Sequence, residues 1–136
     1  MPPEPPRDSD AHQTLYGEQT RRALENFAIG GRPMPAAFIH ALALVKACAA
    51  RVNGELGALD RATAEAIDRA ATAVAQGGHD GQFPVDVLQT GSGTSTNMNA
   101  NEVIAALASR ELGRTVHPND EVNRGHAHRS IVKSAQ

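Results

Sequence analysis

Residues 89–105 read Gln-Thr-Gly-Ser-Gly-Thr-Ser-Thr-Asn-Met-Asn-Ala-Asn-Glu-Val-Ile-Ala, and this stretch is the most informative one in the sequence. In it glycines alternate with hydroxyl side chains, and asparagines then lead into an apolar pattern of helical spacing. Glycine lets the backbone approach a ligand closely, and the first amides of a helix are unpaired donors. The stretch therefore predicts a loop and helix start that bind a small anion, a carboxylate or a phosphate. Ordinary loops and helix caps have a similar composition, so a purely structural role is the alternative.

The same stretch resembles, almost letter for letter, the substrate loop of class II fumarate hydratases in the fumarase/aspartase superfamily. Further segments match that family in the same order: residues 15–22 with its Gly-x-Gln-Thr-x-Arg pattern, residues 79–84 before the loop, and residues 116–123 with its His-Pro-Asn-Asp pattern. The resemblance covers residues 15–125. Ser92, in Gly-Ser-Gly-Thr, favours the fumarase branch over aspartases, which usually have Gly-Ala-Gly-Thr.

The resemblance implies a mainly α fold, the N-terminal helical domain of the fumarase/aspartase superfamily, with long loops and little strand over residues 15–125. Residues 1–14 are expected to form a disordered, proline-rich lead-in. Residues 126–136 are expected to form a divergent tail at the truncated start of the family's helical-bundle domain. The implied reaction is the reversible hydration of fumarate to L-malate in the tricarboxylic acid cycle, in a homotetramer, without a cofactor or a metal.

Two sets of site residues follow from the resemblance. One set matches the positions that contact the carboxylates of the substrate: Ser92, Gly93 and Thr94. The other set matches a secondary carboxylate site near the active-site entrance: His117, Pro118, Asn119 and Asp120. A common surface turn has the composition of the second set, and the charge of its aspartate opposes an anion. Thr20 and Arg21 belong either to the pocket wall or to a solvated helix start.

The family's catalytic residues lie in later sequence that this chain does not match, so no catalytic residue is assigned. After Gly125 the family continues with Gln-Ser-Ser-Asn-Asp, whereas this chain has His-Ala-His-Arg-Ser at residues 126–130. His126 and His128 have no obvious third ligand, which argues against a metal site. The sequence thus predicts an inactive fragment of a fumarate hydratase. The alternatives are a non-catalytic relic or interaction module that retains a dicarboxylate-binding loop, and a fragment of an aspartase-type ammonia-lyase.

The composition predicts a core of small side chains. The 136 residues include no Trp, one Tyr and three Phe, so alanine and aliphatic contacts must provide the packing. Alanine buries little apolar area, which predicts marginal stability alone and burial against partner chains or missing segments. The net charge of −2 gives no sign of nucleic-acid binding. No stretch is predicted to span a membrane, the start does not resemble a signal peptide, and a cytoplasmic protein is expected.

Hydrophobic periodicity predicts four helices, at about residues 17–27, 35–56 and 60–76, and from near residues 97–101 to Gly113. Asp60 is the expected cap of the third helix, and Gly113 ends the fourth. We also expect a short extended piece at residues 83–87 and a polar loop at residues 117–125.

The second helix carries the strongest apolar pattern. Residues recur there at spacings of three and four: Phe38, Leu42, Val45, Ala49 and Val52. Ile39, Leu44 and Cys48 widen this stripe, which indicates burial on more than one side. Cys48 is expected to be a small buried hydrophobe. Lys46 is either a buried structural charge or an exposed side chain.

Overall fold

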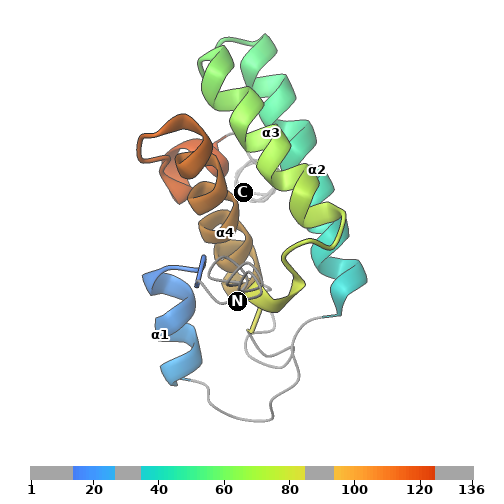
Figure 1. Ribbon diagram of the computed structural model, residues 1–136, viewed down its shortest axis with the longest axis vertical. Coiled ribbons are helices and arrows are strands. Elements are labelled where there is room, and N and C mark those ends of the chain that lie inside the picture. Colours follow the sequence, from blue (N-terminus) through green and yellow to red (C-terminus); the bar gives the residue numbers. More distant parts are fainter. Residues whose placement is uncertain (1–13, 27–34, 85–93, 125–136) are drawn as a thin grey trace, which may run out of the picture.

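Helices account for most of the described part of the chain, residues 14–26, 35–84 and 94–124 of this computed structural model (Figure 1). The helices are α1 (Glu18–Asn26), α2 (Ala36–Glu55), α3 (Arg61–Ala75) and α4 (Thr94–Leu112). A 3-10 turn follows α3 at Asp80–Gln82, and a π-helical turn follows α4 at Pro118–Val122. The described residues contain no strand, so the predicted mainly α fold is confirmed.

The helix boundaries agree with the sequence where a capping residue fixes them. Asp60 caps α3, because its carboxylate accepts a hydrogen bond from the Thr63 backbone N–H at 3.1 Å. Gly113 follows α4 with a φ of +70°, a conformation that glycine adopts without strain. Both assignments confirm the predicted ends.

The structure corrects three local predictions, and parts of other predictions fall outside the described residues. The fourth helix begins at Thr94, earlier than predicted, because Thr94, Ser95 and Thr96 form its first turn instead of a preceding loop. The predicted loop at 117–125 contains the π-helical turn at Pro118–Val122, since proline is suited to a first helical position. Phe83 and Pro84 form no strand. The rest of that extended piece, the lead-in to residue 13 and the tail at 126–136 lie outside the described residues.

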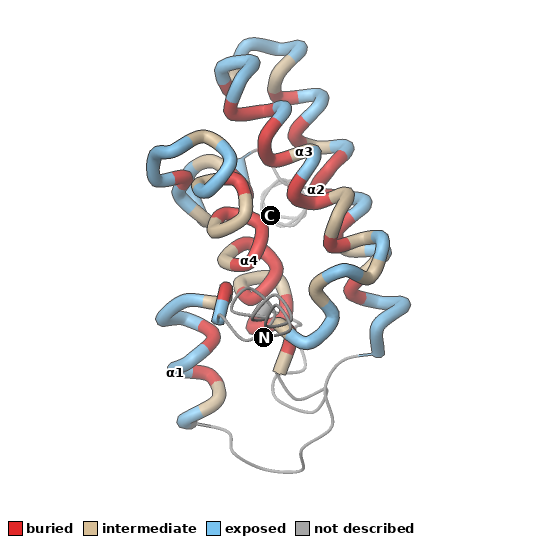
Figure 2. The backbone as a smooth tube through the Cα atoms, viewed as in Figure 1, coloured by how far each residue is buried: buried red, intermediate tan, exposed pale blue. Residues whose placement is uncertain are grey.

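The helices pack as an antiparallel pair, α2 and α3, with α4 against α3 and α1 against α4 (Figure 1). Figure 2 shows buried positions along the faces where α2, α3 and α4 meet. Alanine makes up half of the core and larger, mostly aliphatic side chains the other half, among them Ile39, Ala43, Ala47, Ala50, Ile67, Ala71, Val74, Val103, Ile104 and Ala108. This composition confirms the predicted core of small side chains.

The buried face of α2 differs from the prediction. Most of the larger residues of the predicted stripe and its margin are about half exposed: Phe38 49%, Leu44 55%, Val45 47% and Val52 50%. The buried face instead carries Ile39, Lys46 and a row of alanines. Since α2 is apolar on nearly all sides, spacing alone cannot choose the face, and small alanines allow the closer contact with α3. Cys48 is exposed, so its predicted burial was wrong.

By length and composition alone, α2 is also a helix that can cross a membrane, and this corrects the expectation that no stretch has this property. Among the described residues it is the one helix that meets these criteria. A single such helix is weak evidence for a membrane segment, because core helices of soluble proteins meet them too.

Candidate functional site

The predicted substrate loop leads into the N-terminus of α4. Thr94 is the first residue of that helix, whereas Ser92 and Gly93 lie outside the described residues. The first amides of a helix have no partner within it, and the helix dipole favours an anion at this end. Ser95 and Thr96 in the same turn are buried. The start of α4 therefore provides donors of the kind that a carboxylate needs.

A buried lysine lies next to this first turn. The Lys46 side chain has an exposure of 0%, and its Nζ donates a hydrogen bond of 2.7 Å to Asn97 Oδ1. Asn97 Nδ2 in turn lies 3.5 Å from Asn123 Oδ1. Burial lowers the pKa of Lys46 to about 7, since the charged ammonium is poorly solvated there. Of the two interpretations of Lys46, a buried charge and an exposed side chain, the structure supports the first: the side chain is buried, and it carries a charge below about pH 7.

Further amides line the first turns of α4. Asn99 Nδ2 donates to the Gln82 carbonyl at 2.9 Å, which connects α4 to the turn after α3. Asn99 Oδ1 and both amide atoms of Asn101 are buried and have no hydrogen-bond partner in the described part of the chain. Buried polar groups in proteins are usually paired, so this cluster is an unusual concentration of polarity inside an alanine core.

Glu102 connects α4 to α1. Its carboxylate accepts hydrogen bonds from Thr20 N at 2.8 Å, Thr20 Oγ1 at 2.7 Å and Gln19 N at 3.3 Å. These backbone amides belong to the first turn of α1 and have no partner within that helix. A Cβ at Gly17 would collide with Glu102 Oε2, which explains a glycine at this close approach. Thr20 is buried and Arg21 exposed, so the matched segment functions here as a capped helix start.

Replacing Glu102 by Ala is expected to loosen α1 while α2 and α3 stay folded. Hydrogen bonds to a charged group contribute about 1.5–3 kcal/mol, so the α1 amides should exchange with solvent at least about tenfold faster. Hydrogen exchange followed by NMR measures this directly. Glu111→Ala, which removes an exposed α4 carboxylate paired with Arg69, is the matched control. Equal α1 protection in both variants would contradict this role of Glu102.

The secondary carboxylate residues come together at one hollow. His117, Pro118, Asn119 and Asp120 line a cavity of about 230 Å³ together with Gln19, Met98 and Glu102. Two of the lining groups, Glu102 and Asp120, are carboxylates, and Glu102 is already engaged by the donors of α1. Anion binding would therefore depend on His117, the Asn119 amide and the backbone. The structure shows that these residues line one hollow, and anion binding there stays a prediction.

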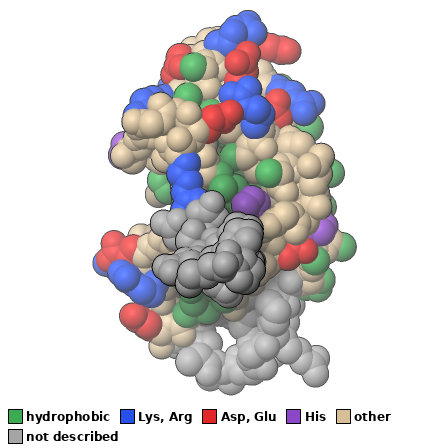
Figure 3. Space-filling model, in the orientation of Figure 1, with side chains coloured by type: hydrophobic (Ala, Val, Ile, Leu, Met, Phe, Trp, Pro, Cys, Tyr) green, Lys and Arg blue, Asp and Glu red, His purple; other side chains and the backbone are tan. Residues whose placement is uncertain are grey.

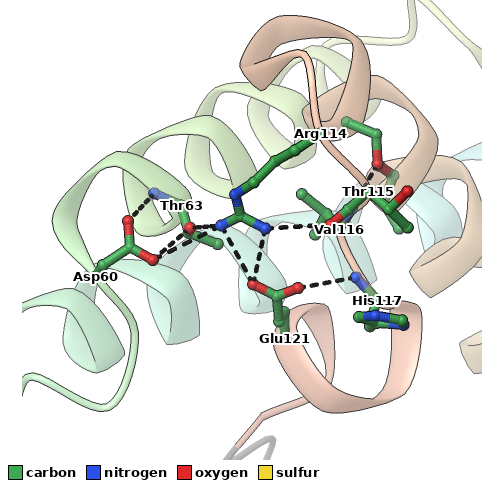
Figure 4. A network of polar contacts seen from close by, with 9 residues as sticks. Asp60, Thr63, Arg114, Thr115, Val116, His117 and Glu121 are labelled. Carbon is green, nitrogen blue, oxygen red and sulfur yellow. Dashed lines mark hydrogen bonds and ion pairs between the residues drawn. The ribbon is translucent and has the colours of Figure 1, made fainter.

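Arg114, which the sequence analysis did not single out, attaches this hollow to α3 (Figure 4). Its guanidinium donates to Thr63 Oγ1 and to the Thr115 carbonyl, and it lies 3.5 Å from Glu121 and 3.6 Å from Asp60. Glu121 Oε1 accepts a hydrogen bond of 3.1 Å from the His117 backbone N–H. Hydrogen bonds from Thr63, helped by the charge of Arg114, lower the pKa of Asp60. The network fixes the backbone of the turn that carries His117.

A second hollow, of about 220 Å³, lies between α2 and α3 and is lined by charges of both signs, among them Arg51, Glu55, Arg61, Glu65 and Asp68. Arg51 Nε donates to Asp68 Oδ2 at 2.7 Å, and this bond raises the pKa of Arg51. Figure 3 shows acidic and basic side chains intermixed over this end of the α2–α3 pair. Arg51 is paired with Asp68, and Glu55 and Glu65 add two further carboxylates to the lining, which disfavours an anion here.

The described residues contain no cluster of three or more His, Cys, Asp or Glu side chains that could hold a metal ion. His126 and His128 lie outside them. Asp80 pairs with His40 Nε2 at 2.7 Å, which connects the turn after α3 to the first half of α2.

Comparison with known proteins assigns the family. The model of the Lyase family matches residues 7–135. The class II fumarate hydratase of Xylella fastidiosa is 57% identical over 121 residues, and that of Nitrosomonas europaea is 54% identical over 127 residues. Each alignment covers 89% of this chain but only 26% and 28% of the respective relative.

Solved structures agree with this assignment. The native fumarate lyase:delta crystallin from Brucella melitensis has a TM-score of 0.78 and 44% identity over 82% of this chain and 27% of that one. The recombinant class II fumarase from Schistosoma mansoni has a TM-score of 0.78 and 42% identity over 82% of this chain and 25% of that one. The chain spans about a quarter of the length of these relatives. It belongs to the Lyase family and corresponds to the N-terminal domain of class II fumarate hydratases.

Proposed function

We propose that this chain forms one wall of the dicarboxylate pocket of a fumarate hydratase and binds fumarate or L-malate at the start of α4. The observation that carries the proposal is the position of Thr94, which places the end of the Gly-Ser-Gly-Thr segment at a helix N-terminus. Ser92, Gly93 and Thr94 donate to one substrate carboxylate. Neutral donors at a helix start bind such a group without a fixed countercharge.

The wider function is the reversible hydration of fumarate to L-malate in the tricarboxylic acid cycle, in the cytoplasm. Hydration requires a base near the carbon next to a carboxylate and donors that stabilise the resulting aci-carboxylate. Residues 15–125 form the domain between the lead-in and the tail, and this domain supplies hydrogen-bond donors for the substrate. The base comes from a further part of the enzyme, so this chain alone binds without turnover. The hollow with His117, Pro118, Asn119 and Asp120 is a secondary carboxylate site.

The exposed apolar side chains of α2 favour a second function, the association of this chain with another protein chain. Phe38, Val45 and Val52 are each about half exposed, and large apolar side chains grouped along one helix are typical of surfaces that another protein covers. In a homotetrameric fumarate hydratase, this face would be covered by further lyase chain. An interaction module without a ligand is the competing interpretation, and ligand binding distinguishes the two.

Titration with succinate, a dicarboxylate that cannot be hydrated, is expected to shift the backbone amides of residues 91–96 in NMR spectra of the isotope-labelled chain. One carboxylate held by helix-start donors predicts a dissociation constant of about 1 mM or below. Thr94→Ala should weaken binding about tenfold, because a hydrogen bond to a charged group is lost. Butyramide, of the same length but without a carboxylate, is the matched ligand control and should leave these amides unmoved. Amides that stay unmoved at about 10 mM succinate would refute the binding function.

A further inference from the structure

Lys46 is a buried charge without a countercharge in the described part of the chain. Its exposure is 0%, and the ion pairs among the described residues do not include it. Burying an ammonium costs free energy unless it is paired and hydrogen-bonded, and an apolar side chain of similar volume would pack this position better. Stability therefore does not explain a lysine here.

The lysine determines which way the Asn97 amide points. An ammonium group has only donors, so Asn97 must present its Oδ1 to Lys46, which it does at 2.7 Å. The Asn97 NH2 group is consequently turned away from Lys46 and lies 3.5 Å from Asn123 Oδ1. That distance is at the long limit for a hydrogen bond, so this donor has capacity for a closer acceptor.

The position of Asn97 suits a ligand at the start of α4. It lies in the first turn, three residues after Thr94, and it is only partly buried, whereas Lys46 behind it is fully buried. A positive charge behind an amide polarises its N–H groups, and it adds to the favourable potential of the helix N-terminus. A dianionic substrate gains more from this charge than a monoanion does.

We propose that Asn97 donates through Nδ2 to a carboxylate of the substrate, and that Lys46 is the positioning residue that orients and polarises this donor. The inference rests on the proposed dicarboxylate function of the α4 start. It adds a charged residue to the neutral donors that we propose for this site. The competing interpretation is that the Lys46–Asn97 hydrogen bond only holds α2 against α4.

The test compares succinate binding by the wild-type chain with binding by Lys46→Met, Lys46→Arg and Arg51→Met, using NMR titration at about pH 6, where Lys46 holds its proton. Lys46→Met keeps the length of the side chain without its charge and is expected to raise the dissociation constant at least about tenfold. Lys46→Arg should restore part of the affinity. Arg51→Met removes the same charge from an exposed position of α2 paired with Asp68 and should change the affinity by less than about twofold.

The spectra also separate positioning from packing. The Asn97 side-chain NH2 signals should shift with succinate in the wild-type chain, and they should lose this response in Lys46→Met while its thermal unfolding temperature is maintained or higher. Wild-type affinity in Lys46→Met would overturn the inference and leave the proposed function standing. A wild-type chain that fails to bind succinate would overturn both.

Asn97→Asp serves as the second variant if Lys46→Met does not fold. The new carboxylate would pair with Lys46, which favours folding, but it cancels the charge and replaces the donor with an acceptor. Succinate binding should fall at least about tenfold. Binding at wild-type strength by this folded variant would equally overturn the role of Asn97.

Discussion

The free energy of unfolding of the chain is expected to rise by about 2 kcal/mol between pH 7 and about pH 9. The cause is Lys46, whose pKa is lowered by burial from 10.5 to about 7. In this pH range the unfolded chain holds a proton on Lys46 that the folded chain has largely released. Stability increases with pH wherever the unfolded state binds more protons, so the sign is positive. The trend should persist until the pH approaches 10.5, where the unfolded chain also loses the proton.

Chemical denaturation at a series of pH values measures this slope, with Lys46→Met as the reference. In that variant the rise between pH 7 and about pH 9 that Lys46 causes should disappear. At pH 7 the variant should be more stable than the wild type by about 2 kcal/mol, the relief of charge burial less the cost of an unpaired Asn97 oxygen. A wild-type chain whose stability is flat or falls over this range would show that Lys46 keeps its proton well above pH 7 in the folded state.

The sequence predicts those parts of the fold that depend on single residues with a local preference. Asp60 and Gly113 mark helix ends because a capping carboxylate and a glycine with positive φ each act within a few residues. The likeness to fumarate hydratases likewise rests on short contiguous segments. His117 and Asp120 could be assigned together from one such segment, and both line one hollow.

Other features depend on contacts between distant segments, which spacing along one helix does not contain. Lys46 lies near Asn97 across 51 positions, and Glu102 holds Thr20 across 82. Arg114 had only a weak signal, a basic residue directly after the glycine that ends α4. A lysine inside an apolar helix is visible in the sequence, but its burial depends on the packing of α4 near α2, which the sequence does not reveal.

The choice of face on α2 is the clearest case, and it leads to a strong mutational contrast. Replacing Ile39 by Ala is expected to lower the free energy of unfolding by about 3 kcal/mol, whereas Leu44→Ala should lower it by less than about 1 kcal/mol. Both changes shorten an aliphatic side chain in α2. Ile39 is 1% exposed within the core, while Leu44 is 55% exposed.

The contrast should be large because most core positions on α2 and its neighbours are alanine, so each large side chain supplies an unusual share of the buried apolar area. Urea denaturation of both variants and of the wild type gives the values, provided that the dependence on urea concentration is the same in all three. If Leu44→Ala were the more damaging change, the core would be built on the stripe from Phe38 to Val52 that periodicity favours. The expected order instead places the alanine-rich face against α3 and leaves the larger apolar side chains of α2 available for contact with further protein.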